Sequence, residues 1–580
     1  MMRVSRPLKP IPWVLATLVV ALVVRGVFLA QLPAGAPLDA DTTVYLDVLR
    51  HHLWENLAYS PRKPPLFELV HAPVAWLFGD ETIARYRLLT VELFLLDGAA
   101  MALLAAAAMR LRAWPPLAFA VMTLYSLCLM PLELNATHYD RPLPFFAGLF
   151  LLALARVVAS RGERGLGETG MVAVSVAGAL LIAQSTVASL LVPLLVVIAV
   201  VMAGPPFSFR RLAGRLALGL ALPGVMLGVL VAKTHAVSGI AATANGAGHT
   251  HILFVMNMYD WKRDRVRQAA VEAGAPAWYL WCYDNPVRVD DTPDMMYARS
   301  LGSCGVDRWG DPRGADMTAL LAAMVGLGDD RMAAVVREDM AIAAERPHVL
   351  PPFGTWASRW FAEYSRQNTR IAAHVFRTDT GRWLINAYNI HHNMWVREGP
   401  KSLGAYVRQM WPEPGSPIPL RRPLELANRY LETITRATYL ALPEIVIVLA
   451  LGLLLPPLFR ARARGEDNGA ASPGLWGLLS AAAAFDAMMA AAGRLSRPAF
   501  ADAVAERWRT GTLSATRPSS ATLGAAALTI PPVLVMTAIF CGTVGTENER
   551  FFQQALPYLC ILATVIATAL GRIVRAAVRG

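Results

Sequence analysis

Long apolar segments separated by short basic loops are the dominant pattern along the 580-residue chain. The first segment runs from Ile11 to Ala30 and follows Arg3, Arg6 and Lys9. Further apolar segments lie at 88 to 109, 113 to 134, 142 to 159, 214 to 233, 437 to 459, 522 to 543 and 554 to 571. With a helical rise of about 1.5 Å per residue, each can cross a bilayer. The pattern predicts an all-α polytopic membrane protein.

The uncharged stretch from Thr169 to Gly204 is longer than one crossing needs. Arg161 and Arg164 precede it, and Arg210, Arg211 and Arg215 follow it. Because both ends carry basic groups, we expect a helical hairpin that turns near residues 184 to 186 and returns to the same side. With these two segments, the expected number of transmembrane helices is about ten.

The basic loops between the apolar segments also predict sidedness, since Lys and Arg concentrate in cytoplasmic loops. They place both termini in the cytoplasm. The membrane is expected to be the inner (plasma) membrane. Arg572, Arg575 and Arg579 mark the C-terminal end. A cleaved signal peptide is the alternative to an uncleaved first helix, but the apolar run is long for a signal. Residues 472 to 492 are interrupted by Asp486 and are not counted as a crossing.

Three parts follow from this topology. Residues 1 to 233 form an N-terminal transmembrane module whose first external loop spans 31 to 87. Residues 234 to 436 are too long for a connector and are expected to form a large external (periplasmic) domain, mixed or α-rich. Residues 437 to 580 form a C-terminal transmembrane module with a basic cytoplasmic loop at 460 to 521.

Tryptophan is concentrated in the external domain, which holds nine of the fifteen in the chain. The stretches around Trp278-Trp281 and Trp356-Trp360 are expected to build the core of this domain and to anchor it at the membrane surface. Stacking on a sugar is the alternative.

Composition agrees with a membrane protein, because 55% of the residues are hydrophobic and only 17% are charged. The net charge of +12 comes from the basic loops between apolar segments and does not indicate nucleic-acid binding. The five cysteines form no CxxC pair, so neither a zinc site nor a disulfide-dense scaffold is indicated. Whether Cys282 and Cys304 pair in an oxidising compartment stays open.

Candidate chemistry begins in the first external loop, where Asp39-Ala40-Asp41 is followed by Tyr45 and then by Arg62-Lys63-Pro64-Pro65-Leu66. On spacing alone, these can be solvated loop residues. The pattern nevertheless resembles the GT-C superfamily of membrane glycosyltransferases, and is similar to the bacterial aminoarabinose transferases and protein O-mannosyltransferases. The resemblance continues at Gly79 and Arg85, at 138 to 143 (His-Tyr-Asp-Arg-Pro-Leu) and, loosely, at 547 to 552. It hardly covers the middle of the chain.

The resemblance implies roles for matching residues. Asp41 takes the place of the catalytic base, Asp140 that of a second acid, and Lys63 that of a ligand for the donor phosphate. Many family members have a second acid directly after the first, but this chain has Thr42 there, so whether Asp39 substitutes is open. Further phosphate-binding candidates are Arg62, Arg85 and Arg141, and further site candidates are Tyr45, His138, Glu547 and Arg550.

The implied reaction is inverting transfer of a sugar from a polyprenyl-phosphate donor to a hydroxyl of a lipid, polysaccharide or protein. One carboxylate base is enough for it, because the leaving phosphate is a stable anion that needs cations and no acid. A glycosidase would need two carboxyl groups at a defined separation. No cofactor is expected; a divalent cation on Asp39, Asp41 and Asp140 is the alternative. Four histidines, His249, His251, His391 and His392, lack the partners of a metal site.

Three acids fall inside predicted crossings: Glu92, Asp97 and Glu444. Ionisable groups are costly there, and we expect them to brace the bundle, with Glu92 and Asp97 facing Arg25. The same acids support the alternative function, a transporter or flippase of a lipid-linked or polar solute. No internal repeat accompanies them, as such transporters commonly have. A third alternative is a non-enzymatic envelope assembly factor.

Overall fold

The computed structural model describes residues 9–30, 51–59, 65–77, 82–129, 142–160, 164–185, 187–203, 209–243, 247–260, 262–284, 317–345, 359–392, 421–442, 520–543 and 548–579. All regular elements in these ranges are helices, and none of these residues forms a strand. The prediction of an all-α chain is therefore confirmed for them. The predicted crossing at 437 to 459 is described only as far as residue 442, and the segment at 472 to 492 lies outside the described residues.

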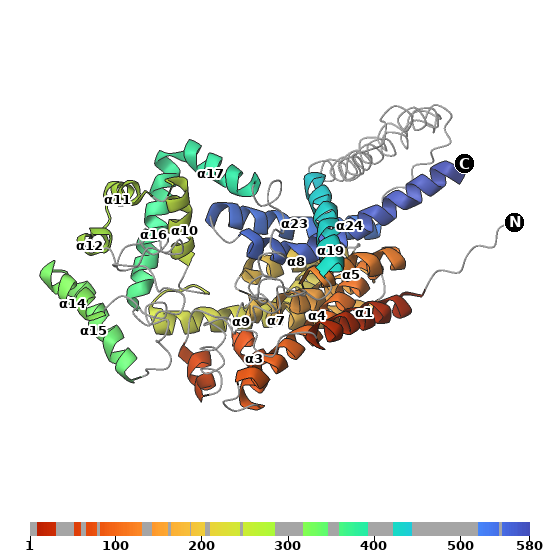
Figure 1. The fold of residues 1–580 in the computed structure, drawn as a ribbon, viewed down its shortest axis with the longest axis horizontal. Coiled ribbons are helices and arrows are strands. Elements are labelled where there is room, and N and C mark those ends of the chain that lie inside the picture. The colour runs from red at the N-terminus through yellow and green to blue at the C-terminus, as the bar shows by residue number, and fades with distance from the viewer. Residues whose placement is uncertain are drawn as a thin grey trace.

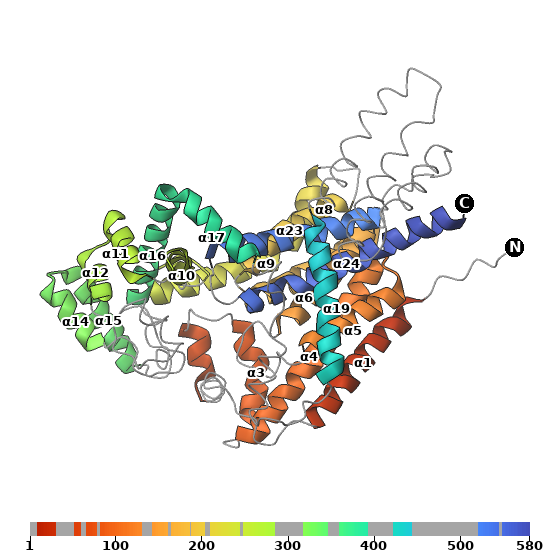
Figure 2. The same cartoon turned by 45° about the horizontal axis from the view of Figure 1, so that its top comes forward.

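The predicted apolar segments form helices that pack into one apolar bundle (Figures 1 and 2). These helices are α1 (Pro10–Ala30), α4 (Thr82–Arg110), α5 (Pro115–Leu129), α6 (Leu143–Ala159), α7 (Arg164–Gln184), α8 (Ala188–Met202), α9 (Phe209–Ser238), α23 (Ser520–Thr543) and α24 (Asn548–Arg579). The segments Pro10–Val27, Val91–Arg110 and Phe209–Ser238 are long and apolar enough to cross a membrane. Shorter apolar helices make up the rest of the bundle.

Helix α1 has the polarity of a lipid-facing helix. Its exposed face carries an apolar stripe of Ile11, Leu15, Val19, Val23 and Val27, each at least 42% exposed. The opposite face buries a charged residue, Arg25, and a polar one, Thr17, each only 1% exposed. This distribution, with apolar side chains outward and a charged side chain inward, is the reverse of that on a typical helix at the surface of a water-soluble protein.

The predicted hairpin turn is confirmed, since α7 ends at Gln184 and α8 begins at Ala188. Its two helices pack closely where Gly178 of α7 leaves no room for a side chain. A Cβ atom at Gly178 would lie 2.9 Å from Val192 of α8, 3.2 Å from Pro223 of α9 and 3.3 Å from Phe150 of α6. Four helices therefore meet at this glycine.

Gly178→Val is expected to destabilise the bundle by about 1–3 kcal/mol, because its side chain overpacks a site bounded by three stiff neighbours. The midpoint of thermal unfolding in detergent micelles measures the effect. Gly224→Val on α9 is the matched control, since nothing lies within 4 Å of a Cβ atom there. Equal losses for both variants would show that helix propensity, and not packing, is responsible.

The middle region has a hydrophobic core of its own. Its helices are α10 (Ala247–Met258), α11 (Arg263–Glu272), α12 (Ala277–Asp284), α14 (Met317–Gly326), α15 (Asp330–Glu345), α16 (Arg359–Thr378) and α17 (Thr380–His392). It lies on the left of Figure 1, with α10 and α17 against α23 and α16 against α9.

Aromatic rings fill this core. Trp360 and Tyr364 of α16 stack at 5.6 Å, Tyr279 stacks on Tyr364 at 5.2 Å, and Trp278 meets Trp360 edge-on at 6.5 Å. Trp278 and Trp360 are 3% and 0% exposed. The prediction that tryptophans build the core is confirmed for these two, while Trp356 lies outside the described residues.

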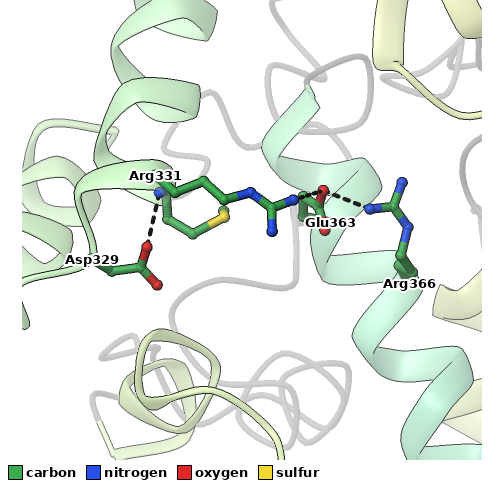
Figure 3. A network of polar contacts seen from close by, with 5 residues as sticks. Asp329, Arg331, Glu363 and Arg366 are labelled. Carbon is green, nitrogen blue, oxygen red and sulfur yellow. Dashed lines mark hydrogen bonds and ion pairs between the residues drawn. The ribbon is translucent and has the colours of Figure 1, made fainter.

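Polar contacts fix α15 against α16. Figure 3 shows Glu363 of α16 between Arg331 of α15, at 3.0 Å, and Arg366, at 2.6 Å. Both arginines are largely exposed, so these ion pairs contribute little. The stronger contact is Asp339, 3% exposed, whose carboxylate accepts the backbone N–H groups of Arg359 at 3.0 Å and Trp360 at 2.8 Å. Asp339 thus caps the start of α16 from a neighbouring helix.

Burial raises the pKa of Asp339 from 3.8 to about 6, against the lowering effect of the two backbone hydrogen bonds. Between pH 3.8 and about pH 6, the folded protein binds more protons than the unfolded chain. The contribution of this carboxyl group to the free energy of unfolding therefore decreases as the pH rises. Relative to Asp339→Asn, which does not titrate, the unfolding free energy is expected to fall by about 2 kcal/mol between about pH 4 and pH 7. Denaturant unfolding followed by tryptophan fluorescence measures it. A difference independent of pH would contradict the assignment.

Helix α19 (Arg421–Leu440) begins within the stretch predicted as external, yet it packs on the apolar bundle. It contacts α5 and α24, and its buried residues Ala427, Leu431 and Tyr439 belong to the bundle core. Helix α19 therefore packs on the bundle, and its Tyr439 also contacts His391 of α17 in the middle region.

Candidate functional site

Most residues of the sequence-predicted site lie outside the described residues. These are Asp39, Asp41, Tyr45, Arg62, Lys63, His138, Asp140, Arg141 and Glu547. Arg85 falls in the first turns of α4 and Arg550 at the start of α24. The structure does describe the helices that flank each of these segments, and their directions can be compared.

Helix α1 runs antiparallel to α4. Leu18 and Leu22 of α1 fill the space beside Gly98 of α4, and the Arg25 side chain pairs with Asp97. The Arg25 guanidinium also lies over the ring of Phe94, 5.8 Å from its centre. The chain therefore leaves α1, before the acids at 39 and 41, toward the end of the bundle where α4 begins.

Contacts between side chains also give the relative directions of α6, α7 and α9. Helix α6 is antiparallel to α7, because Val157 lies at Gly170 and Phe150 at Gly178. Helix α9 is parallel to α7, because the backbone N–H of Leu222 bonds Ser175 Oγ at 3.2 Å and Met171 lies at Gly219. The start of α6, just after the acid at 140, thus lies where α7 and α9 end.

The direction of α24 follows from a hydrogen bond near its C-terminal end. Thr568 Oγ1, in its C-terminal half, accepts the backbone N–H of Trp114 in the turn between α4 and α5 at 2.8 Å. Helix α24 therefore begins toward the opposite end, where α4 begins. The end of α9 lies near the start of α4, because α3 (Pro65–Leu77) packs on Leu89 and Leu93 of α4 and its Glu68 interacts with Lys233 of α9. The segments that hold Asp41, Asp140 and Glu547 are therefore joined to helix ends on one side of the bundle.

Part of the loop predicted to be external, residues 31 to 87, is described, and it packs on this side. Helix α3 (Pro65–Leu77), directly after the Lys63 segment, contacts α4 and α7. Residues 51–59 are also helical. A small apolar cluster joins both to α4 through Leu53, Ala72, Val74, Leu89 and Leu93. The five undescribed residues at 60 to 64, which include Arg62 and Lys63, are thus bracketed by two helices that pack on α4.

Two buried ionisable side chains of α3 lie near ionisable side chains of α4 and α9. His71 Nδ1 lies 3.2 Å from Glu92 Oε2 of α4, and their side chains are 2% and 20% exposed. Glu68, 3% exposed, interacts electrostatically with the half-buried Lys233 near the end of α9. Sequence reasoning did not single out Glu68, His71 or Lys233. For two of them the sequence contains a signal: Glu68 and His71 are three residues apart, on one face of an otherwise apolar helix.

The expected brace around Arg25 is confirmed for one acid and wrong for the other. Arg25 pairs with Asp97 through Nη2, and the same nitrogen donates to the carbonyl oxygen of Ser126 at 2.8 Å. A further nitrogen contact reaches the Ser126 hydroxyl. Glu92 instead faces His71, because it lies more than a turn nearer the start of α4. Glu444 lies outside the described residues.

The histidines outside the bundle make hydrogen bonds of their own. His251 Nδ1 lies 3.3 Å from Thr369 Oγ1, and His391 Nε2 lies 2.5 Å from the Tyr439 hydroxyl. Burial lowers the pKa of both, which favours the neutral ring. Within the described ranges, no group of three His, Cys, Asp or Glu side chains could hold a metal ion. Asp39, Asp41 and Asp140 lie outside those ranges.

Comparisons of the chain with protein-family models, with curated proteins and with solved structures found no match.

Proposed function

We propose that this chain is a multi-pass inner-membrane glycosyltransferase of the GT-C type. It transfers a sugar from a polyprenyl-phosphate donor to a hydroxyl acceptor on the external face, with Asp41 as the base and Lys63 binding the donor phosphate. The observation that carries the proposal is that the segments holding Asp41, Lys63, Asp140 and Glu547 all join helix ends on one side of the bundle.

The polarity of the bundle supports a membrane setting. Helix α1 turns an apolar stripe outward and buries Arg25, and α9 exposes Leu222, Val225 and Val229. A lipid donor enters such a site from the bilayer, so acids and cations at the membrane surface are where transfer from a lipid phosphate needs them. The middle region then forms the external domain that receives the acceptor.

Transport or lipid flipping is less well supported. That alternative drew on the acids inside predicted crossings, which would have to be available to bind a solute or ion. Asp97 is engaged by Arg25, and Glu92 faces His71. Both therefore have a partner within the protein.

Radiolabelled sugar on a polyprenyl-phosphate donor tests the proposal directly. Membranes that contain the protein are expected to move the label to an endogenous acceptor, whereas membranes that lack it are not. Sealed vesicles of both orientations show the side of transfer. Uptake of a polar solute without any transfer of label would favour the transporter.

A further inference from the structure

The inner face of α17 attaches this helix to the middle region. Trp383 and Ile390 on this face pack on Phe254 of α10, and the rings of Trp383 and Phe254 lie 4.2 Å apart. Asn386, on the same face, donates from Nδ2 to the backbone carbonyl oxygen of Phe254 at 3.4 Å. These contacts account for one side of α17 only.

The outer face of α17, formed by Leu384, Ile385 and Tyr388, is apolar as well. These side chains are 58%, 62% and 63% exposed, and their spacing puts them on one side of the helix. Arg382 and Asn389, seven residues apart, lie on a third and polar side. An ordinary surface helix has a single apolar stripe, which faces the core. A second apolar face, open on the surface, marks an interaction site.

The helices of the middle region that lie away from the bundle have charged outer faces. Their exposed charged residues include Asp264, Arg265 and Glu272 of α11 and Arg337 and Glu338 of α15. Figures 1 and 2 show α11 and α15 at the end of the middle region away from the bundle, whereas α17 contacts α23 of the bundle. The exposed apolar face therefore lies where the middle region meets the bundle.

Contacts at the end of α17 also lead to the bundle. His391 Nε2 lies 2.5 Å from the hydroxyl of Tyr439 of α19, and the Tyr439 side chain is part of the apolar core of the bundle. Helix α23, which α17 contacts, is apolar from Gly524 to Ile539 and exposes Leu534 on its own outer side. The outer face of α17 thus continues an apolar surface of the bundle, and that surface is suited to lipid.

We propose that the outer face of α17 docks on the bilayer, in the leaflet on the side of the middle region. Amphipathic helices that lie on a membrane bury their apolar side chains about 5–10 Å into the boundary between head groups and acyl chains. Leu384 and Ile385 contact the acyl chains there, and Tyr388 keeps its hydroxyl among the head groups. The middle region is then attached both to the bundle and to lipid. This role is independent of sugar transfer.

Photo-crosslinking in the full-length protein, reconstituted into vesicles of phosphatidylethanolamine and phosphatidylglycerol, tests the proposal. Benzoylphenylalanine in place of Ile385 is expected to form adducts with phospholipid, detected by mass spectrometry. The matched control carries it in place of Val325 of α14, which is 54% exposed but lies away from the bundle, and should give no lipid adduct. The proposal fails if position 385 gives no lipid adduct, or if its adducts join a second copy or another segment of the chain.

Hydrogen exchange of the α17 amides in the same vesicles gives a second measurement. Ile385→Asp puts a carboxylate next to lipid, so exchange across α17 is expected to become about tenfold faster. Val325→Asp, the same change on a face in water, should leave α17 exchange unaltered. If the outer face of α17 also meets water, Ile385→Asp changes exchange by less than about twofold, as surface substitutions commonly do, and the proposal is wrong.

Discussion

Asp41→Asn is expected to reduce sugar transfer by about 10²–10⁴-fold, the contribution typical of a positioned general base. The asparagine amide has nearly the same size and shape as the carboxylate but cannot accept the proton of the acceptor hydroxyl. The leaving phosphate departs without receiving a proton, so a second acid in the site cannot compensate for the loss of Asp41 by assisting that departure. The loss should appear in kcat, with KM for the donor little changed, since Lys63 and the neighbouring arginines are intact.

Asp47→Asn is the matched control for this variant, because it removes the same charge from the same loop, six residues further along. Asp39→Asn answers the question raised by Thr42. If Asp39 serves as the second acid, its variant loses activity to a lesser degree than Asp41→Asn. Full activity in Asp41→Asn, in a sample whose thermal unfolding matches that of the wild-type protein, would remove Asp41 from the mechanism.

The helical part of the fold could largely be predicted from the sequence. Apolar runs bounded by basic residues predicted α1, α4 to α9, α23 and α24, with helix ends that differ from the observed ones by up to eight residues, and Gln184 marked the hairpin turn. The signal is strong because a bilayer requires long apolar segments whose backbone is hydrogen-bonded internally. Helix α19 was harder to assign, because its apolar residues form one stripe among charged ones and resemble an ordinary surface helix.

Partners across the bundle could be predicted only in part. A lone Arg25 in an apolar helix demands an acid, and two were within reach along the sequence, Glu92 and Asp97. Which of them meets Arg25 depends on the register between α1 and α4, which Gly98 sets by admitting Leu22. The sequence does not indicate His71 as the partner of Glu92, since hydropathy carries no information on the packing of α3 against α4.

The cap on α16 shows a second limit. Asp339 lies in the middle of α15, where a single acid on a charged helix is usually solvated. It is buried instead, because α16 starts against it and directs two backbone N–H groups at its carboxylate. Contacts between elements separated by a long connection carry no local sequence pattern, so Asp339 could be recognised only in the structure.

Arg25→Met is expected to destabilise the bundle by about 3–5 kcal/mol, the cost typical of breaking a buried ion pair from one side. Arg25 and Asp97 are 1% and 6% exposed, so the variant leaves a carboxylate buried in the bundle without its guanidinium partner. The hydrogen bonds to Ser126, which tie α1 to α5, are lost as well. Thermal unfolding in detergent micelles, followed by far-ultraviolet circular dichroism, measures the change.

The double variant Arg25→Met/Asp97→Leu separates the two contributions. Replacing a buried ion pair by apolar side chains of similar volume is often neutral or stabilising, so the double variant should recover most of the loss. Arg156→Met is the matched control, because Arg156 lies on the exposed side of α6 and its replacement should change stability little. A double variant as unstable as Arg25→Met would mean that the contacts with Ser126, and not the charge of Asp97, make Arg25 necessary.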